Sequence, residues 1–144
     1  MRKTGSAQKV CSFYVSNIHF ATMILPFVNK QVEEKTEIIT FFENNFTTNI
    51  ELVLSKITAQ EDCKKKLLEI NWKDTNVNKY SLVEKTLKNK IKKQNKTIII
   101  INGTENYINI INELIEKYLE KNNKKIATEN IKIMDFYEVR EFQR

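Results

Sequence analysis

Residues 97–101 read TIIII, and this stretch decides the fold class. Four consecutive isoleucines leave no polar side chain to face water, so the pattern predicts a strand buried on both faces. Such strands are typical of parallel sheets that carry helices on each side. We therefore expect residues 97–101 to lie at the centre of a mostly parallel sheet. The turn Asn102-Gly103-Thr104 follows, and Thr104 can cap a long helix.

Four further strands are predicted on either side of this stretch, and helical patterns separate successive strands. Helix-length connections between strands indicate crossover units, which impose parallel pairing. The economical architecture is one α/β domain with three layers (α/β/α) and a mostly parallel five-stranded sheet. The additional strands are predicted at residues 10–15 (VCSFYV), 37–42 (EIITFF), 67–72 (LLEINW) and 131–137 (IKIMDFY).

The length of 144 residues suits a single domain with a real core. We expect residues 1–8 to be a flexible lead and residues 9–144 to form the domain. The apolar run at residues 10–15 predicts a buried strand, which makes Cys11 a buried free thiol. The last strand could lie at a sheet edge, where pairing with a second copy is conceivable, so a homodimer stays open.

The composition is basic, with a formal charge of +6 and 21 lysines against three arginines. Proteins that bind nucleic acids usually rely on arginine for contacts with bases and phosphates. We therefore interpret most of these lysines as solvated surface residues. The alternative is a basic face for nucleic acid or an acidic partner, formed by Lys85, Lys88, Lys92, Lys93 and Lys96. The longest apolar stretch, residues 18–28, is too short to span a membrane.

The sequence lacks the motifs of common enzyme classes. Neither of its two glycines begins a phosphate loop, GxxxxGK[ST], or a dinucleotide fingerprint, GxGxxG. The sole histidine, His19, has no nucleophile elbow near it. The two cysteines form no CxxC and no His/Cys cluster, which indicates no metal site and fits a reducing cytoplasm. No catalytic residue and no cofactor are predicted.

Ligands of parallel sheets bind beyond the carboxyl ends of the strands, so the candidate ligand-binding residues lie in those loops. They are His19, Glu43, Asn44, Trp72, Asn102, Gly103 and Thr104. Each also has a structural explanation. Gly103-Thr104 can bind an anion at a helix N-terminus or form an ordinary turn. His19 can contact a ligand or lie on the surface, and Trp72 can stack on a ligand or fill the core.

Two segments carry a resemblance to a known family. The first, KVCSFYVSNIHFATMILPFVNKQVEE with the following EIITFFEN, contains Phe13-Tyr14 before a helix with Leu25-Pro26-Phe27. The second is the closing stretch IKIMDFYEVREF, which contains Tyr137, Arg140 and Phe142. Together they resemble the MEDS domain, a DcmR-like sensory domain, although Lys9 stands where the family typically has histidine.

The resemblance implies a fold similar to the RecA/KaiC ATPase core, P-loop-NTPase-like without the Walker A phosphate loop. It also implies a sensory or regulatory signalling role, exercised here through a small ligand or a protein partner. Two alternatives stay open. One is the nucleic-acid-binding module using the lysines named above. The other is an unrecognised enzyme, which requires Glu43, His19 and Thr104 to converge around a pocket at the carboxyl edge of the sheet.

Overall fold

The computed structural model describes residues 7–57, 61–75 and 80–139. These residues form one parallel sheet of four strands, in the spatial order β1-β4-β3-β2. The strands are β1 (Gln8–Tyr14), β2 (Glu37–Phe42), β3 (Thr97–Gly103) and β4 (Ile131–Glu138). Neighbouring strands pair in parallel throughout, so the predicted parallel α/β class is confirmed.

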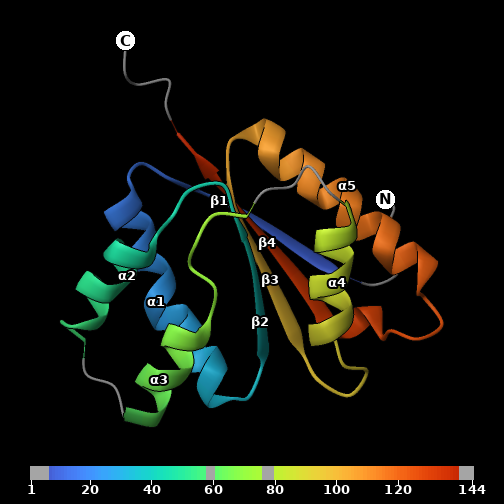
Figure 1. Ribbon diagram of the computed structural model, residues 1–144, viewed down its shortest axis with the longest axis horizontal. Helices are drawn as coiled ribbons and strands as arrows, with labels where there is room; N and C mark the ends of the chain where they lie inside the picture. Colours follow the sequence, from blue (N-terminus) through green and yellow to red (C-terminus); the bar gives the residue numbers. More distant parts are fainter. Residues whose placement is uncertain (1–6, 58–60, 76–79, 140–144) are drawn as a thin grey trace.

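Helices cover both faces of the sheet, which confirms the three layers (Figure 1). One face carries α1 (Asn17–Glu33), α2 (Thr47–Leu54) and α3 (Glu61–Glu69), and the other carries α4 (Tyr80–Lys90) and α5 (Glu105–Lys121). A short 3-10 turn, η1 (Thr128–Asn130), leads into β4. The two faces hold two separate apolar clusters, because the sheet itself divides the core.

The central strand β3 is buried along its entire length, as the isoleucine run predicts. Side chains alternate across a strand, so its isoleucines supply both clusters. Ile98 and Ile100 pack on the side of α1, whereas Ile99 and Ile101 pack on the side of α5. The expected strands at residues 37–42 and 131–137 are likewise confirmed as β2 and β4.

The strand predicted at residues 67–72 is wrong, and the sheet has four strands rather than five. Leu67 and Ile70 of LLEINW follow Cys63 at helical spacing. The three side chains therefore lie on one face of α3 and of the residue that follows it. Leu68 points away and is 53% exposed. Beyond the helix, the described residues up to Thr75 approach β2 as a strand at one bridge, between Phe42 and Asp74.

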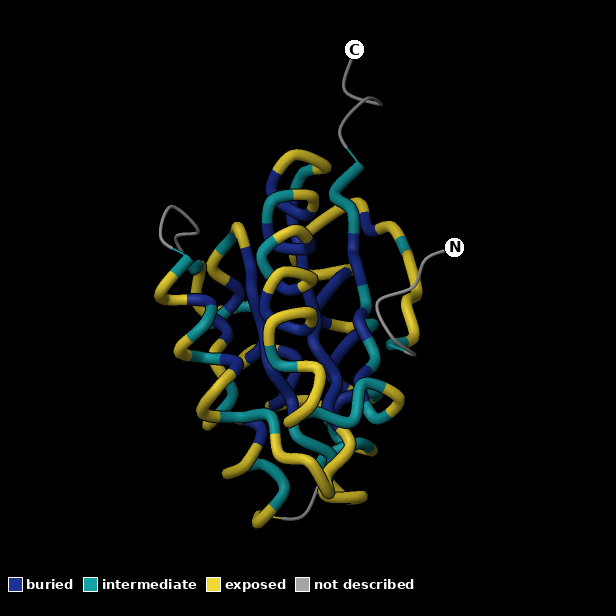
Figure 2. Tube along the Cα trace, turned by 90° about the vertical axis from the view of Figure 1, so that its right-hand side faces the viewer, coloured by how far each residue is buried: buried dark blue, intermediate teal, exposed yellow. Residues whose placement is uncertain are grey.

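The positions of the two terminal strands also differ from the expectation. The strand at residues 10–15 corresponds to β1, an edge strand that is largely exposed (Figure 2), and Cys11 is an exposed thiol rather than a buried one. The last strand lies inside the sheet, because β4 pairs with both β1 and β3. A short apolar run predicts a strand but carries no information about which strands become neighbours, so it cannot separate an edge strand from a buried one.

The flexible lead was predicted to include residue 8, but Gln8 is the first residue of β1. Residues 1–6 lie outside the described part of the chain. Among the described helices, none combines the length and the apolar character that a membrane crossing requires.

Candidate functional site

Glu43, Gly103 and Thr104 do come together at the carboxyl edge of the sheet. Thr104 caps α5, and its backbone N–H and its hydroxyl both donate to Glu43 Oε1, at 2.8 and 3.0 Å. The carboxylate therefore sits at the positive end of the α5 dipole. An anion at this helix N-terminus would have to displace the protein's own Glu43, so the contact favours the structural explanation of the turn.

Gly103 makes this contact sterically feasible. Its φ of 154° is unfavourable for other residues, and an added Cβ would lie 2.7 Å from Glu43 Oε1 and 2.8 Å from Glu43 Cβ. Both distances are shorter than any relaxed contact of a methyl group. The only glycine among the described residues thus stands where the backbone must approach another side chain closely.

Two amide side chains at this edge have unpaired donors. Asn102 is fully buried and accepts a hydrogen bond from Tyr14 Oη at 3.1 Å, while its Nδ2 has no partner among the described residues. Asn44 Nδ2 is likewise buried and unpaired within the described ranges. The hydrogen bond from Tyr14 of β1 holds the Asn102 side chain in place.

His19 and Trp72 do not join this group. His19 is exposed in the first turn of α1, where its Nδ1 accepts from Val15 N–H at 3.2 Å and its own N–H donates to Ser16 Oγ at 3.1 Å. Trp72 is buried, donates its indole N–H to Leu67 O at 2.8 Å and stacks on Phe42. His19 therefore acts as a local turn residue and Trp72 as part of the core.

The five lysines of the basic alternative are all exposed. Lys85 and Lys88 lie on α4, and Lys92, Lys93 and Lys96 lie in the connection to β3. Lys92 Nζ donates to Asn89 O at 3.1 Å, which ties it to the end of the helix. No group of His, Cys, Asp and Glu in the described ranges could hold a metal ion. Arg140 and Phe142 of the resemblance lie outside those ranges.

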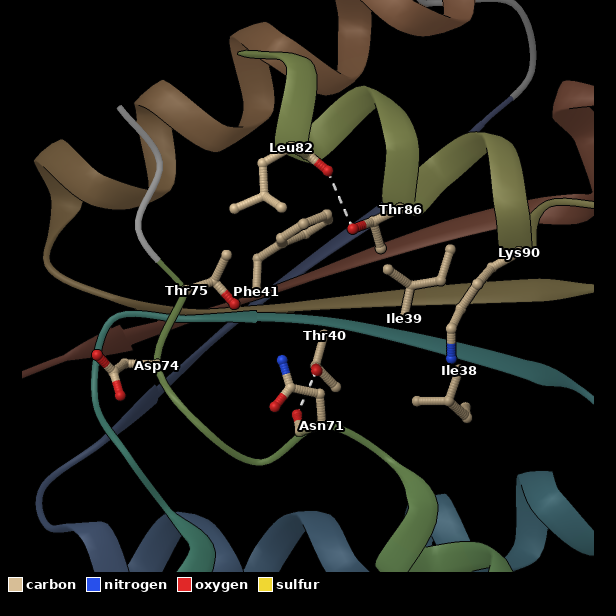
Figure 3. Close-up of a pocket in the computed structure, with 10 residues that line it drawn as sticks. All are labelled: Ile38, Ile39, Thr40, Phe41, Asn71, Asp74, Thr75, Leu82, Thr86 and Lys90. Carbon is tan, nitrogen blue, oxygen red and sulfur yellow. Dashed lines mark hydrogen bonds between the residues drawn. The ribbon is translucent and has the colours of Figure 1, made fainter. Parts of the chain in front are cut away.

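A groove at the other edge of the sheet was not predicted. It follows the open side of β2, between α4 and the segment of residues 71–75 (Figure 3). Asp74 lies near the carboxyl end of β2 and Lys90 near its amino end. The lining consists of Ile38, Ile39, Thr40, Phe41, Asn71, Asp74, Thr75, Leu82, Thr86 and Lys90. Its volume of about 260 Å³ falls below the usual range of pockets for drug-sized ligands.

The floor of this groove is the backbone of β2. In a parallel strand, alternate residues direct both backbone groups to one neighbour, and the residues between them direct theirs away. The N–H groups of Glu37 and Glu43 donate to carbonyls beside β3, so the odd-numbered residues face β3. The N–H and C=O groups of Ile38 and Thr40 consequently face the groove, where no described strand pairs with them.

Tyr107 fixes the carboxyl end of the groove. Its hydroxyl lies 3.0 Å from Phe42 O and 2.9 Å from Thr75 O, and Thr75 N–H donates to Phe42 O at 2.8 Å. Burial first, and then the carboxylates of Glu43 and Asp74, raise the pKa of the Tyr107 phenol above its ordinary value. The phenol therefore stays protonated and remains a hydrogen-bond donor at neutral pH.

The side walls are held by short polar contacts (Figure 3). Thr40 Oγ1 donates to Asn71 O, which ties the lower wall to β2, and Thr86 Oγ1 donates to Leu82 O within α4. Lys90 Nζ lies 3.7 Å from Glu37 Oε2 at the amino end. Leu82 is 43% exposed and supplies an apolar contact on the upper wall.

A buried polar cluster under α5 was also missed. Asp135 on β4 is buried, accepts from Asn112 Nδ2 at 3.2 Å through both oxygens, and lies 3.4 Å from Lys9 Nζ on β1. Burial raises the pKa of its carboxyl, while the Asn112 hydrogen bond and the Lys9 charge act in the opposite direction. The sequence does indicate this cluster, because a polar residue interrupts an apolar face at both positions. Asp135 shares a strand face with Ile131 and Ile133, and Asn112 interrupts an apolar helix stripe.

No family model matches the chain, and neither a curated protein nor a solved structure matches it.

Proposed function

We propose that this chain is a non-catalytic regulatory domain that acts by binding an extended segment of a partner protein in the groove along β2. The observation that carries the proposal is the open edge of β2, where the backbone groups of Ile38 and Thr40 line the floor of a walled groove. A strand added there would receive main-chain hydrogen bonds from β2, and the walls would select its side chains.

The groove also defines the chemistry of the partner segment. Its lining on β2 consists of residues 38–41, so a strand of about four residues, or roughly 13 Å, covers it. Asp74 at one end favours a basic side chain, whereas the charge of Lys90 at the other end is already compensated by Glu37, whose Oε2 lies 3.7 Å from Lys90 Nζ. Between these ends, Leu82 offers an apolar contact on the α4 side, whereas Thr40 and Asn71 offer polar contacts on the opposite side.

The resemblance to the MEDS family supports a signalling role, with a cytoplasmic signalling or regulatory protein as the partner. A P-loop-NTPase-like fold without the phosphate loop belongs to the same proposal. It is supported by the passage from β1 into α1 through Val15-Ser16, which contains no glycine. A small ligand at the carboxyl edge has less support, because Glu43 already occupies the N-terminus of α5.

An enzyme built from Glu43, His19 and Thr104 has no support in the contacts. Glu43 bonds to Thr104, but His19 bonds to Val15 and Ser16 at the start of α1. The nucleic-acid module stays a prediction that rests only on five exposed lysines. Fluorescence anisotropy with DNA and RNA at low salt tests it, since binding through lysines must weaken steeply as salt rises.

The groove is tested with peptides selected from a displayed random library against the full chain. We expect the selected peptides to be extended, with a basic residue at the end that lies beside Asp74. Hydrogen exchange should then show new protection at the amides of Ile38 and Thr40, which face the groove. Affinity is measured by fluorescence anisotropy with the labelled peptide.

A matched pair of variants locates the binding surface. L82K puts a charge on the groove wall, whereas L52K puts the same charge on α2, where Leu52 is also exposed. Peptide affinity should fall at least tenfold in L82K and stay unchanged in L52K. The proposal is wrong if both variants bind alike, if protection appears at other amides, or if the library yields no binding peptide.

A further inference from the structure

The other edge of the sheet carries a concentration of exposed apolar side chains. Seven large hydrophobic residues are exposed in the described part of the chain, and four of them lie on β1, directly after it or in the first turn of α1. They are Val10, Phe13, Val15 and Ile18. Phe13 is the most exposed of all, at 63%, and its ring lies against Tyr137 of β4 at 5.8 Å.

The hydrogen-bonding edge of β1 is open as well. Val139 N–H donates to Tyr14 O, so the even-numbered residues of β1 face β4. The N–H and C=O groups of Lys9, Cys11 and Phe13 therefore point outward, and no described strand pairs with them.

β1 also lacks the usual devices that protect an edge from pairing. Such edges normally carry proline, a bulge or free charges. β1 contains no proline and no glycine, and its one charged side chain, Lys9, contacts the buried carboxylate of Asp135. The edge thus presents backbone groups and apolar side chains with almost no uncompensated charge.

We infer that β1 pairs antiparallel with β1 of a second copy of this chain, which joins two four-stranded sheets into one continuous sheet. A two-fold axis at Cys11 sets Lys9 opposite the partner's Phe13 and the two Cys11 residues opposite each other. Each of the three residues whose backbone groups point outward then lies opposite such a residue of the second copy. Each of these three pairs exchanges two backbone hydrogen bonds, so six form across the edge. The inference concerns the edge opposite to β2, so it is independent of the proposed function.

Charge favours a second copy as the occupant. In this register the two Lys9 side chains lie four residues apart along the strands, roughly 13 Å, so they do not repel each other strongly. The apolar stem of each Lys9 can cover the exposed ring of the opposing Phe13. A strongly charged foreign strand would find no compensating charge on this edge. The contact is one strand wide, so the dimer depends on concentration.

Sedimentation velocity over a range of concentrations tests the dimer. We expect the wild type to shift from monomer to dimer as the concentration rises. F13K should remain monomeric, and L68K, which changes another exposed apolar residue on α3, should behave as the wild type. C11R, which places two like charges at the two-fold axis, serves as a second disrupting variant, and circular dichroism checks the folding of each.

Thiol cross-linking tests the register. Opposed residues of a hydrogen-bonded antiparallel pair have Cα atoms about 5.5 Å apart, which lies within disulfide range. Mild oxidation of C63S should give a covalent dimer, whereas C11S, which keeps Cys63, should give none. The inference is overturned if the wild type stays monomeric up to about 1 mM, if F13K and C11R dimerise as the wild type does, or if C11S cross-links as readily as C63S.

Discussion

Gly103 is the residue whose identity the structure constrains most tightly. Alanine at this position would place Cβ 2.7 Å from Glu43 Oε1 in a backbone conformation that favours glycine. We expect G103A to lower the free energy of unfolding by about 1–3 kcal/mol, since strained φ/ψ values typically cost that much. Urea denaturation measures the change.

A double-mutant cycle shows whether the clash with Glu43 contributes to this cost. E43A removes the contact with the Glu43 carboxylate but keeps the contact with Cβ of residue 43 at 2.8 Å, so the loss caused by G103A should be smaller in the E43A background without disappearing. Equal losses in both backgrounds would mean that the carboxylate of Glu43 contributes nothing and that the φ value and the contact with Cβ of residue 43 account for the cost. A wild-type stability for G103A would contradict the steric argument altogether.

Asp135 should give the protein a distinctive pH dependence. Burial raises the pKa of this carboxyl above its ordinary value of 3.8 in the folded chain. The folded state then holds the proton more tightly than the unfolded state, so this group lowers stability as the pH rises from about 3.8 through the raised pKa. D135N lacks the titration, and thermal unfolding between pH 3.5 and pH 8 compares the two chains.

The expected result is a difference in unfolding free energy, D135N minus wild type, that grows with pH and then levels off. Groups that titrate in both chains cancel in this difference. A difference that is constant with pH would show that the Asn112 hydrogen bond and the Lys9 charge fully compensate the burial of the carboxyl.

Single residues were predictable from the sequence where one local rule decides. Thr104 as a helix cap follows from residue type and position, and the structure confirms it. The contact of Thr104 with Glu43 spans 61 residues, and no local pattern indicates it. Asp135 and Asn112 could have been found, because each breaks an apolar face with a polar side chain.

At the scale of elements, Tyr107 links α5 to the segment of residues 71–75 at the end of β2. Y107F removes the hydroxyl that lies near Phe42 O and Thr75 O. We expect faster hydrogen exchange at the Thr75 amide, with a loss of roughly 1 kcal/mol in global stability, the usual contribution of one hydrogen bond.

Y80F is the matched control for this prediction. Tyr80 Oη is buried and has no hydrogen-bond partner among the described residues, so its removal should be neutral or slightly stabilising. Unchanged exchange at Thr75 in Y107F would mean that the bridge between Phe42 and Asp74 holds this segment without the phenol.

Two short apolar runs show which elements the sequence could predict. TIIII fits only a strand buried on both faces, because its β-branched residues would crowd one another in a helix. LLEINW fits both the alternation of a strand and the spacing of a helix. The lysine-rich residues before it form the first part of α3 and decide for the helix. Short runs of this kind are ambiguous until the flanking residues are included in the pattern.

At the scale of the whole molecule, the sheet order predicts a gradient of hydrogen exchange. The amides of Ile99 and Ile101 in the buried strand β3 should exchange most slowly. The outward amides of Lys9, Cys11 and Phe13 should exchange fastest among the strands when the protein is dilute. Equal protection of these two groups in dilute solution would contradict the open edge of β1.

The order of the strands was beyond the reach of sequence patterns. Periodicity establishes that strands and helices alternate, and the crossover rule makes neighbouring strands parallel. It does not establish that β4 inserts between β1 and β3, which decides that Cys11 is exposed. The groove beside β2 depends on the same order, since β2 must be an edge strand for its backbone to be open.

The pairing of β1 with β4 also decides how the domain responds to mechanical force. The first and last strands are adjacent and parallel, in register from Gln8 with Lys132 to Tyr14 with Glu138. A pulling force applied at the start of β1 and the end of β4 therefore shears the two strands past each other along their length. All backbone hydrogen bonds between them share that load, so extension should begin with one abrupt rupture rather than gradual unzipping.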